Sequence, residues 1–241
     1  MPGRGRFLTV PLYLQVRNLL AERIAAGLWA PGTMLPNEQE LARELGVSPG
    51  TVRKALDSLE QDRLLLRRQG RGTFVADQAS TELAARFSNI RSATGQRIVG
   101  DLQLLSQVKD TATAIEQERL DLKAGEAVVR TTRLRRDQAR LFMYEQACLA
   151  ASRFPGIEGA DVGSYSISAL AQRYGVHLAK ASERVSLAEA SPEVARWLAV
   201  ALQTPLLKLD RLVFAMSGQP VEWRVGLCHL PEDTAYLGEM H

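Results

Sequence analysis

No part of this chain constrains its fold more than the stretch that begins at Asn37, NEQELARELGVSPGTVRKALDSL. Asn37 stands three positions before Glu40, which is the spacing of a helix N-cap and its capping box. Gly46 can adopt the positive φ that ends a helix. Ser48 can cap a second helix, and Pro49 suits its first position because no N–H is needed there. The stretch therefore predicts two short helices joined by a tight turn.

The apolar residues of this stretch recur at helical spacing, so each predicted helix has one face for a core. They are Leu41, Ala42 and Leu45, followed by Val52, Ala55, Leu56 and Leu59. Two helices joined around a glycine form the arrangement that places the second helix in the DNA major groove. The outward positions of that helix suit contacts with phosphates and base edges, and they are Gly50, Thr51, Arg53, Lys54 and Asp57. A helical hairpin with a solvated charged face is the alternative that this stretch alone leaves open.

A basic hairpin is predicted directly after these two helices. Residues 64–66 and 73–75 are short apolar runs, and residues 67–72, RRQGRG, form the turn between them. Three arginines and two glycines at the tip would bring charge and backbone close to phosphates. A hairpin that follows a helix-turn-helix is a wing, so it extends the predicted DNA-binding surface.

Charge and composition agree with this reading. Residues 1–76 contain 11 Lys and Arg against 7 Asp and Glu, whereas residues 77–241 contain 19 against 20. The basic excess therefore accompanies the helix-turn-helix, as a nucleic-acid partner requires. Two cysteines form no disulfide framework, three scattered histidines lack metal-ligand spacing, and no apolar run reaches the ~18 residues of a membrane span. With no signal-peptide pattern at the N-terminus, we expect a cytoplasmic protein without a cofactor or a membrane partner.

Residues 9–76 resemble the winged-helix domain of the GntR family of bacterial transcription regulators. The matching pieces are an opening helix at residues 12–26 and the run PGTMLPNEQELARELGVSPGTVRKALDSLEQDRLLLRRQGRGTFVA, in that order. The resemblance implies DNA contacts from the second helix, the recognition helix and the wing tip, which here are Gln39, Ser48, Pro49, Gly50, Thr51, Arg53 and Gly70. The neighbouring cations and turn residues complete the predicted surface, and they are Lys54, Arg68, Gln69 and Arg71.

Two positions depart from the family pattern. Many members carry arginine where this chain has Gln39 and Pro49, and those arginines read bases. Gln39 can still bond to adenine in a bidentate way, but Pro49 offers no donor. Sequence recognition is therefore expected to rely on Arg53, Gln39, the wing and the shape of the DNA.

The second half of the chain predicts an α+β fold on an antiparallel sheet. A small polar linker at residues 77–85 is expected to precede a domain at residues 86–236. The expected strands are residues 99–108, 128–134, 141–149, 176–188, 206–216 and 221–229. The expected helices are residues 111–120, 167–174 and 191–202.

This half is similar to the UTRA effector domain of the HutC subfamily, whose fold is that of chorismate lyase. The pieces that carry the resemblance are LKAGE from Leu122, RLR from Arg133, Glu145, Tyr174-Gly175 and LLKLDRLVFAMSGQPVEW. The resemblance implies a pocket for a small anionic metabolite, with a clamp formed by Arg133 and Arg135. The other residues that it assigns to the pocket are Ser88, Glu145, Ser166, Glu222 and, in place of a missing tyrosine, Tyr236. The alternative is that the arginines are solvated strand residues paired with Asp137 and Glu145.

These features together predict a ligand-responsive DNA-binding regulator of transcription. A repressor that binds a two-fold symmetric operator as a homodimer is the expected form, since one recognition helix and one wing cover only a half-site. Two other functions stay open from the sequence. One is an enzyme of chorismate-lyase type with a DNA-binding head, and the other is a DNA-binding protein that responds to no ligand.

Overall fold

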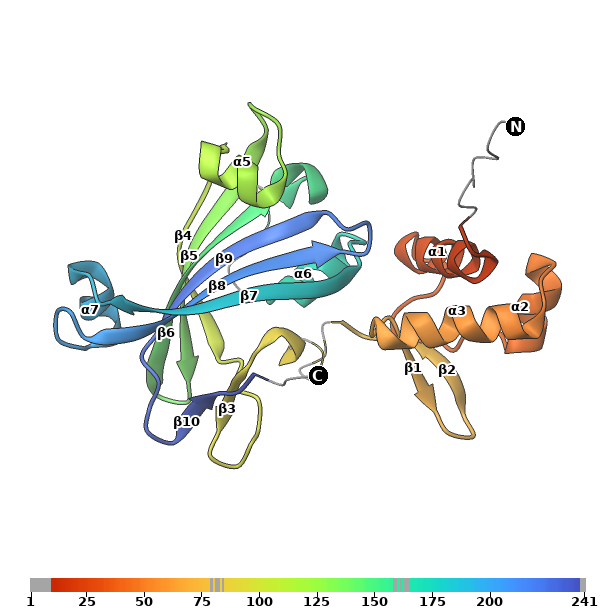
Figure 1. Ribbon diagram of the computed structural model, residues 1–241, viewed down its shortest axis with the longest axis horizontal. Coiled ribbons are helices and arrows are strands. Elements are labelled where there is room, and N and C mark those ends of the chain that lie inside the picture. Colours follow the sequence, from red (N-terminus) through yellow and green to blue (C-terminus); the bar gives the residue numbers. More distant parts are fainter. Residues whose placement is uncertain are drawn as a thin grey trace, which may run out of the picture. The chain divides into compact units, whose positions relative to one another are not determined.

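The chain forms two compact units, Met1–Asp77 and Gln78–His241, and each is described here by itself. The computed structural model (Figure 1) describes residues 10–78, 80, 83, 85–157, 160, 162 and 165–238. Part of the predicted linker and the ends of the chain lie outside these residues. No helix within them is long and apolar enough to cross a membrane.

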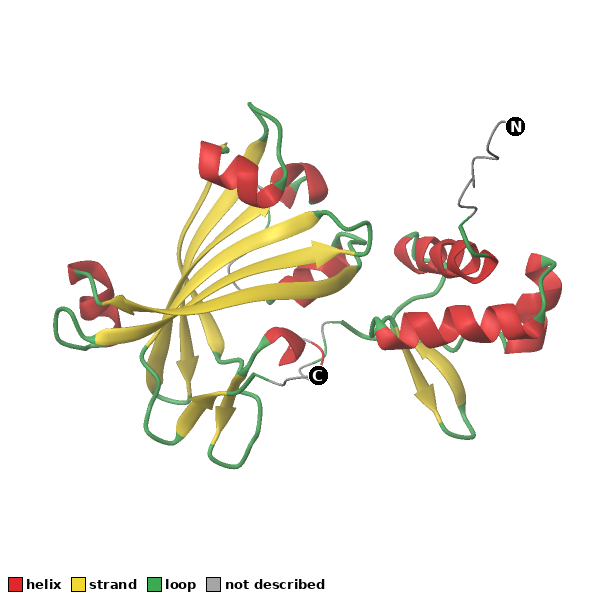
Figure 2. Cartoon of the chain, viewed as in Figure 1, coloured by secondary structure: helices red, strands yellow, loops and turns green. Residues whose placement is uncertain are grey.

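The first unit contains three helices and a hairpin (Figure 2). They are α1 (Leu12–Ala25), α2 (Glu38–Leu45), α3 (Pro49–Gln61), β1 (Leu65–Arg68) and β2 (Gly72–Val75). β1 and β2 pair antiparallel, with Leu65 opposite Val75 and Arg68 opposite Gly72. This is the winged helix-turn-helix that the sequence predicts, although the strands extend further into the turn than the apolar runs alone indicate.

The predicted helix caps are confirmed. The side chain of Asn37 accepts bonds from the backbone N–H groups of Gln39 and Glu40, and the Glu40 carboxylate accepts from the Asn37 N–H at 2.9 Å. Gly46 ends α2 at φ 65°, and Ser48 caps α3 by accepting from the Thr51 N–H. These local bonds set the turn between α2 and α3.

The position of α3 is fixed by the core of the first unit. Its four apolar residues are all buried, and they are Val52, Ala55, Leu56 and Leu59. They pack with Leu20 of α1 and Leu41 of α2, which are also fully buried. Burying a Leu or Val side chain stabilises a fold by roughly 1.5–3 kcal/mol. This core therefore holds the opposite face of α3 toward solvent.

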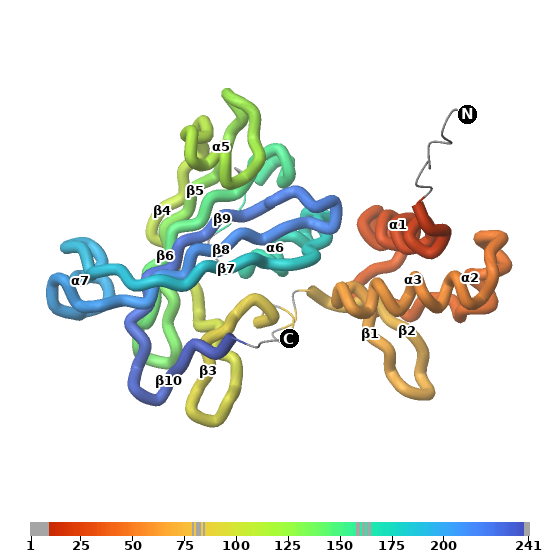
Figure 3. Tube along the Cα trace, in the orientation of Figure 1, coloured from red at the N-terminus to blue at the C-terminus, as the bar shows by residue number. Residues whose placement is uncertain are grey.

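The second unit is built on a six-stranded antiparallel sheet with the order β4-β5-β6-β9-β8-β7, which the trace in Figure 3 follows. Its strands are β4 (Asp101–Thr111), β5 (Ala127–Asp137), β6 (Arg140–Ala150), β7 (Leu178–Glu189), β8 (Pro205–Ala215) and β9 (Pro220–Cys228). A separate two-stranded sheet pairs β3 (Ile90–Ser92) with β10 (Thr234–Tyr236). The helical segments are α5 (Ala114–Leu120), α6 (Ile167–Arg173), α7 (Pro192–Leu198), η1 (Ala85–Phe87) and η2 (Ala151–Arg153).

Each face of the large sheet is covered at its two ends by different elements. On one face, called the α6 face, α6 packs over Val129, Leu149 and Val213, while β3 and β10 pack over Leu209 and Cys228. On the opposite face, α5 and α7 cover two further apolar clusters. The middle of the α6 face therefore lies between two apolar clusters, and its own side chains are not apolar like those of the clusters.

Several helix and strand ends that were predicted from the sequence are wrong in this unit. α5 begins at Ala114 because Thr113 is its N-cap and Thr111 still belongs to β4. α7 ends at Leu198, before the expected residue 202, because Ala199 turns into the left-handed region at φ 53°. β3 and β10 were not expected at all, since three residues are too few to show a strand pattern.

Candidate DNA-binding surface and ligand cavity

The predicted DNA-binding residues lie on the surface of the first unit. All but one are exposed, namely Gln39, Ser48, Pro49, Gly50, Arg53, Lys54, Arg68, Gln69, Gly70 and Arg71, and Thr51 is half-buried. They lie at the start of α2, along the first turns of α3 and at the tip of the hairpin. Exposure on these elements is what DNA contact requires, and the contacts themselves stay a prediction.

Arg53 is held by an acidic neighbour on α2. Its Nε donates to Glu38 Oε2 at 2.9 Å, and its Nη2 lies 2.8 Å from the same oxygen. The hydrogen bond that Glu38 accepts and the charge of that carboxylate raise the pKa of Arg53 above its usual value. Because 65% of the Arg53 side chain stays exposed, the guanidinium can exchange this partner for DNA at little desolvation cost.

The other cations of this surface differ in their partners. Arg67 belongs to an acidic cluster, with Nη1 at 2.6 Å from Asp57 Oδ1, so it ties the hairpin to α3 instead of standing free at the tip. Lys54 Nζ lies 4.3 Å from the ring centre of Tyr13, and Arg68 lies 5.0 Å from that of Phe74. Arg71 has no ion-pair partner within the described part of the chain. It is the tip cation with the least to give up on meeting a phosphate.

In the second unit, Arg133 and Arg135 point to the α6 face and meet Glu145. Arg133 stands directly opposite Glu145 in the β5–β6 ladder, with Nη2 at 2.6 Å from Oε1. Arg135 donates from Nε to Glu145 Oε2 at 2.7 Å. All three are buried, with exposed fractions of 2%, 6% and 0%. The alternative of solvated strand residues is therefore wrong, although the pairing with Glu145 that it included is present.

Glu145 stays charged at the centre of this cluster. Burial raises the pKa of its carboxyl, but the positive charges of Arg133, Arg135 and Arg224 together outweigh burial and hold the pKa well below its usual range. Arg224 lies 3.5 Å from Glu145 Oε2. A buried carboxylate surrounded by three guanidiniums fixes their positions, since removing it would leave positive charges unpaired.

A cavity opens above this cluster on the α6 face. Three of the predicted ligand residues line it, namely Ser88, Arg135 and Ser166. The wall also contains Arg211 and Arg224, which sequence reasoning missed, and apolar side chains such as Phe87 and Met143. Ser88 Oγ donates to the carbonyl of Ile98 at 2.6 Å, which holds that hydroxyl at the cavity rim.

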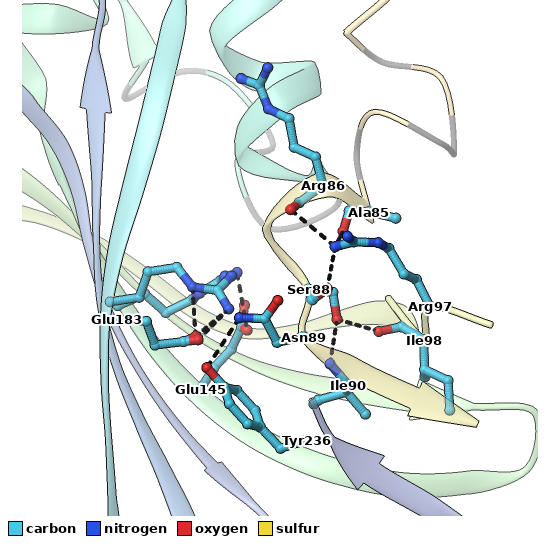
Figure 4. Close-up of polar contacts among 12 residues, drawn as sticks. Ala85, Arg86, Ser88, Asn89, Ile90, Arg97, Ile98, Glu145, Glu183 and Tyr236 are labelled. Carbon is cyan, nitrogen blue, oxygen red and sulfur yellow. Dashed lines mark hydrogen bonds and ion pairs between the residues drawn. The ribbon is translucent and has the colours of Figure 1, made fainter. Parts of the chain in front are cut away.

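Four predicted ligand residues do not form part of the cavity wall. Arg133, Glu145 and Glu222 lie behind it, with Arg133 Nη2 at 3.6 Å from Glu222 Oε1. Tyr236 belongs to β10, and its hydroxyl accepts a bond from Asn89 Nδ2 at 3.1 Å (Figure 4). The large sheet packs Arg133, Glu145 and Glu222 against other protein groups, and a role of these four residues in ligand binding stays a prediction.

Arg211 and Arg224 could have been found from the two-residue period of a strand. Arg224 is two positions after Glu222, so both point to the same face of β9. Arg211 stands directly opposite Arg224 in the β8–β9 ladder. The Nε and Nη2 atoms of Arg211 donate to Glu183 on β7, with Nε at 3.0 Å. Figure 4 shows Glu183 and Glu145 on the sheet, facing the segment that carries Ser88 and Asn89.

Metal binding and thiol chemistry receive no support from the described residues. They contain no group of three His, Cys, Asp or Glu that could hold a metal ion. Cys148 and Cys228 are free and buried. Burial raises the pKa of the Cys228 thiol to about 12, which leaves it protonated at neutral pH.

Comparison with known proteins agrees with both units. Residues 12–75 match the family model "Bacterial regulatory proteins, gntR family", and residues 96–231 match "UTRA domain". A protein of Escherichia coli (strain K12), named "Probable fructoselysine utilization operon transcriptional repressor", is 26% identical over 92% of this chain and 91% of its own length. The "Histidine utilization repressor" of Pseudomonas putida is 34% identical over 49% of this chain and 48% of its own.

A solved structure has the same fold. PhnF from Mycobacterium smegmatis matches with a TM-score of 0.56 and 24% identity, over 94% of this chain and 99% of that chain. The two relatives by sequence carry the names of repressors and not of enzymes.

Proposed function

This chain belongs to the gntR family of bacterial regulatory proteins and carries a UTRA domain, and we propose that it acts as a ligand-responsive transcriptional repressor of the HutC type. The observation that carries the proposal is the pairing of a winged helix-turn-helix with a second unit that contains an arginine-lined cavity. The first unit would bind an operator in the cytoplasm, and the second would bind an effector. Two relatives named as repressors support repression instead of activation of transcription.

Operator recognition is assigned to α2, α3 and the hairpin of the first unit. Arg53 and Gln39 are the exposed side chains able to read base edges in the major groove. Pro49, Gly50 and the hairpin tip allow close approach of backbone to the DNA, and Arg71 would contact a phosphate. Sequence selectivity rests mainly on Arg53, which would leave Glu38 on binding.

The operator is proposed to be two-fold symmetric and to bind a homodimer. One α3 and one hairpin cover a half-site, so two copies are needed for two half-sites. The contact between copies is assigned to residues 86–236. The sheet face opposite α6 supports this assignment, because between α5 and α7 it holds a depression bordered by Val108, which is 54% exposed.

The effector is proposed to be a small organic anion. The cavity wall contains three arginines and two serines, and none of the described residues that line it carries a carboxylate. A guanidinium binds a carboxylate or phosphate through two parallel hydrogen bonds. Binding would favour one arrangement of the second units in the dimer, and so change the spacing of the two recognition helices.

Operator binding by the full chain tests this function. Fluorescence anisotropy with DNA from upstream of its own gene is expected to show specific binding that weakens steeply with salt. Light scattering after size exclusion is expected to give the mass of two chains. A monomer with equal affinity for unrelated DNA would contradict the proposal. Chorismate incubated with the protein is expected to stay unchanged. Its conversion to a product would instead support the alternative of a chorismate-lyase-type enzyme with a DNA-binding head.

A further inference from the structure

We propose that the anionic group of the effector is bound between Arg211 and Arg224, and that Arg133 and Arg135 stabilise the wall instead of clamping the ligand. The inference rests on the proposed function, since it names the ligand subsite of the same cavity. It differs from what the family resemblance implies, which places the clamp on Arg133 and Arg135.

The geometry of the sheet brings Arg211 and Arg224 together. They stand directly opposite each other on β8 and β9 and both line the cavity. Like charges opposite each other in a sheet destabilise the pair of strands. Glu183 lies beyond Arg211 and Glu145 beyond Arg224, so each guanidinium has its ion-pair partner on its outer side. A negative group between them would complete the compensation.

The hydrogen bonds of the four arginines and their places relative to the cavity wall separate them. Arg135 is occupied, because Nε and Nη2 donate to Glu145 and Nη1 donates to the Val99 carbonyl at 2.8 Å. Arg133 is 2% exposed and lies behind the cavity wall. Arg133 Nε and Nη2 make no hydrogen bond to any described residue, but the side chain is not part of the cavity wall, so these donors do not face a ligand in the cavity.

Arg211 and Arg224 keep donors for a ligand. Arg211 uses Nε and Nη2 on Glu183, and its Nη1 donates to none of the described residues. Arg224 makes no hydrogen bond to any residue that the structure describes, and its nearest carboxylate, Glu145, is 3.5 Å away. Its side chain is 11% exposed, so these donors are shielded from bulk water. Such donors are costly to bury unless they find an acceptor.

The charge of the cluster defines the class of ligand. Arg133, Arg135, Arg211 and Arg224 carry four positive charges, and three carboxylates pair with them, on Glu145, Glu183 and Glu222. One positive charge is left over. Burial favours neutralising it with a single negative charge. The ligand group is therefore a singly charged oxyanion, and a carboxylate fits a guanidinium fork best.

Thermal unfolding of the full chain with acetate tests the subsite. At equal ionic strength, the midpoint temperature of unfolding of the wild-type protein is expected to be higher in acetate than in chloride. Inorganic phosphate is expected to raise this midpoint less than acetate does. Arg224→Gln is expected to weaken acetate binding by about tenfold or more. Arg133→Lys is expected to keep it within about threefold, and the exposed Arg184→Gln is the matched control.

Several results of this experiment would contradict the proposed subsite. The proposal fails if wild-type protein gains no more from acetate than from chloride, or if Arg133→Lys abolishes the gain while Arg224→Gln keeps it. A stronger effect of phosphate would overturn the assignment of a single charge. If Arg224→Gln does not unfold cooperatively, Arg224→Lys keeps the charge without the fork and is expected to show the same weakening.

A bromide soak of wild-type crystals locates the anion without any variant. Bromide carries one charge, and its anomalous scattering is expected between Arg211 and Arg224. A cavity without bromide, or bromide beside Arg133, would overturn the proposal. Neither the unfolding experiment nor the bromide soak contains DNA, so both test the anion subsite alone. A failure of operator binding would contradict the proposed function, and it would not change the outcome of these two experiments.

Discussion

Both units place arginines beside glutamates, but the two settings differ in their contact with water. Arg53 and Glu38 of the first unit lie on the surface, with 65% and 29% of their side chains exposed. Arg135 and Glu145 of the second unit are almost fully buried. An exposed pair can be exchanged for another partner at little cost, whereas a buried pair cannot lose one member without leaving a charge in the interior. The DNA surface is therefore adaptable, and the cavity is preorganised.

Removing the central buried carboxylate is the largest expected effect. Glu145→Gln would leave Arg133, Arg135 and Arg224 without their shared partner. The free energy of unfolding of the second unit is expected to fall by about 3–5 kcal/mol, as measured by urea titration. The matched exposed change, Glu38→Gln, is expected to leave unfolding nearly unchanged. Equal losses from the two variants would break the contrast between the units.

A second pair of the second unit, a buried glutamate with a half-buried arginine, extends the comparison through pH. Glu116 on α5 accepts hydrogen bonds from Arg130, chiefly, and from Thr113, and these hold its pKa at about 2, below the usual 4.5. A lowered pKa gives stability that is complete above pH 4.5 and is lost as the pH falls toward 2. The loss is expected to reach about 2–3 kcal/mol.

Glu116→Gln is the comparison for this titration. In acid unfolding followed by circular dichroism, the variant is expected to show a flatter pH dependence between pH 4.5 and 2. An unchanged slope would mean that Glu116 is not the group that titrates. Asp110, which also bonds to Arg130 but is 62% exposed, is expected to contribute much less.

Operator affinity tests the exposed pair of the first unit, Arg53 and Glu38. Arg53→Ala is expected to lower operator affinity by roughly tenfold or more, because its guanidinium is the proposed main base-reading group of α3. Arg43→Ala, an exposed change on α2, is the control. A loss of less than a few-fold in a binding-shift titration would show that α3 is not placed in the groove as proposed. Glu38→Gln is expected to keep or slightly improve affinity, since it removes the competing partner.

The hairpin tip gives the smallest expected effect. Arg71→Ala would remove one proposed phosphate contact, so the slope of log affinity against log salt should decrease by about one, with similar loss on all sequences. Anisotropy titrations at several salt concentrations measure that slope. An effect confined to one operator position would instead make Arg71 a base reader.

The elements that depend on neighbours in sequence were predictable. The capping box of Asn37, the left-handed Gly46 and the buried face of α3 follow from spacing alone. The shared face of Arg133 and Arg135 follows from the period of a strand. Such features depend on local backbone geometry, which a short window of sequence contains.

The features that depend on pairing between distant strands were not predictable. Arg211 and Arg224 meet because β8 and β9 pair in one particular register. Arg53 meets Glu38 because the turn brings two helices together across 15 positions. The cavity wall likewise needs Ser88, Arg135 and Ser166 to come from three separate segments. A period within one strand shows which face a residue takes but not its partner across the sheet.

Operator affinity measured with and without small organic anions tests the link between the two units most directly. We predict that, in a panel of carboxylate-containing metabolites, at least one changes the affinity of wild-type protein for operator DNA. The same compound is expected to have little effect on Arg224→Gln, which should still bind the operator. Operator affinity that no anion changes, or that changes equally in wild-type protein and in Arg224→Gln, would contradict the claim that the cavity of the second unit controls DNA binding by the first.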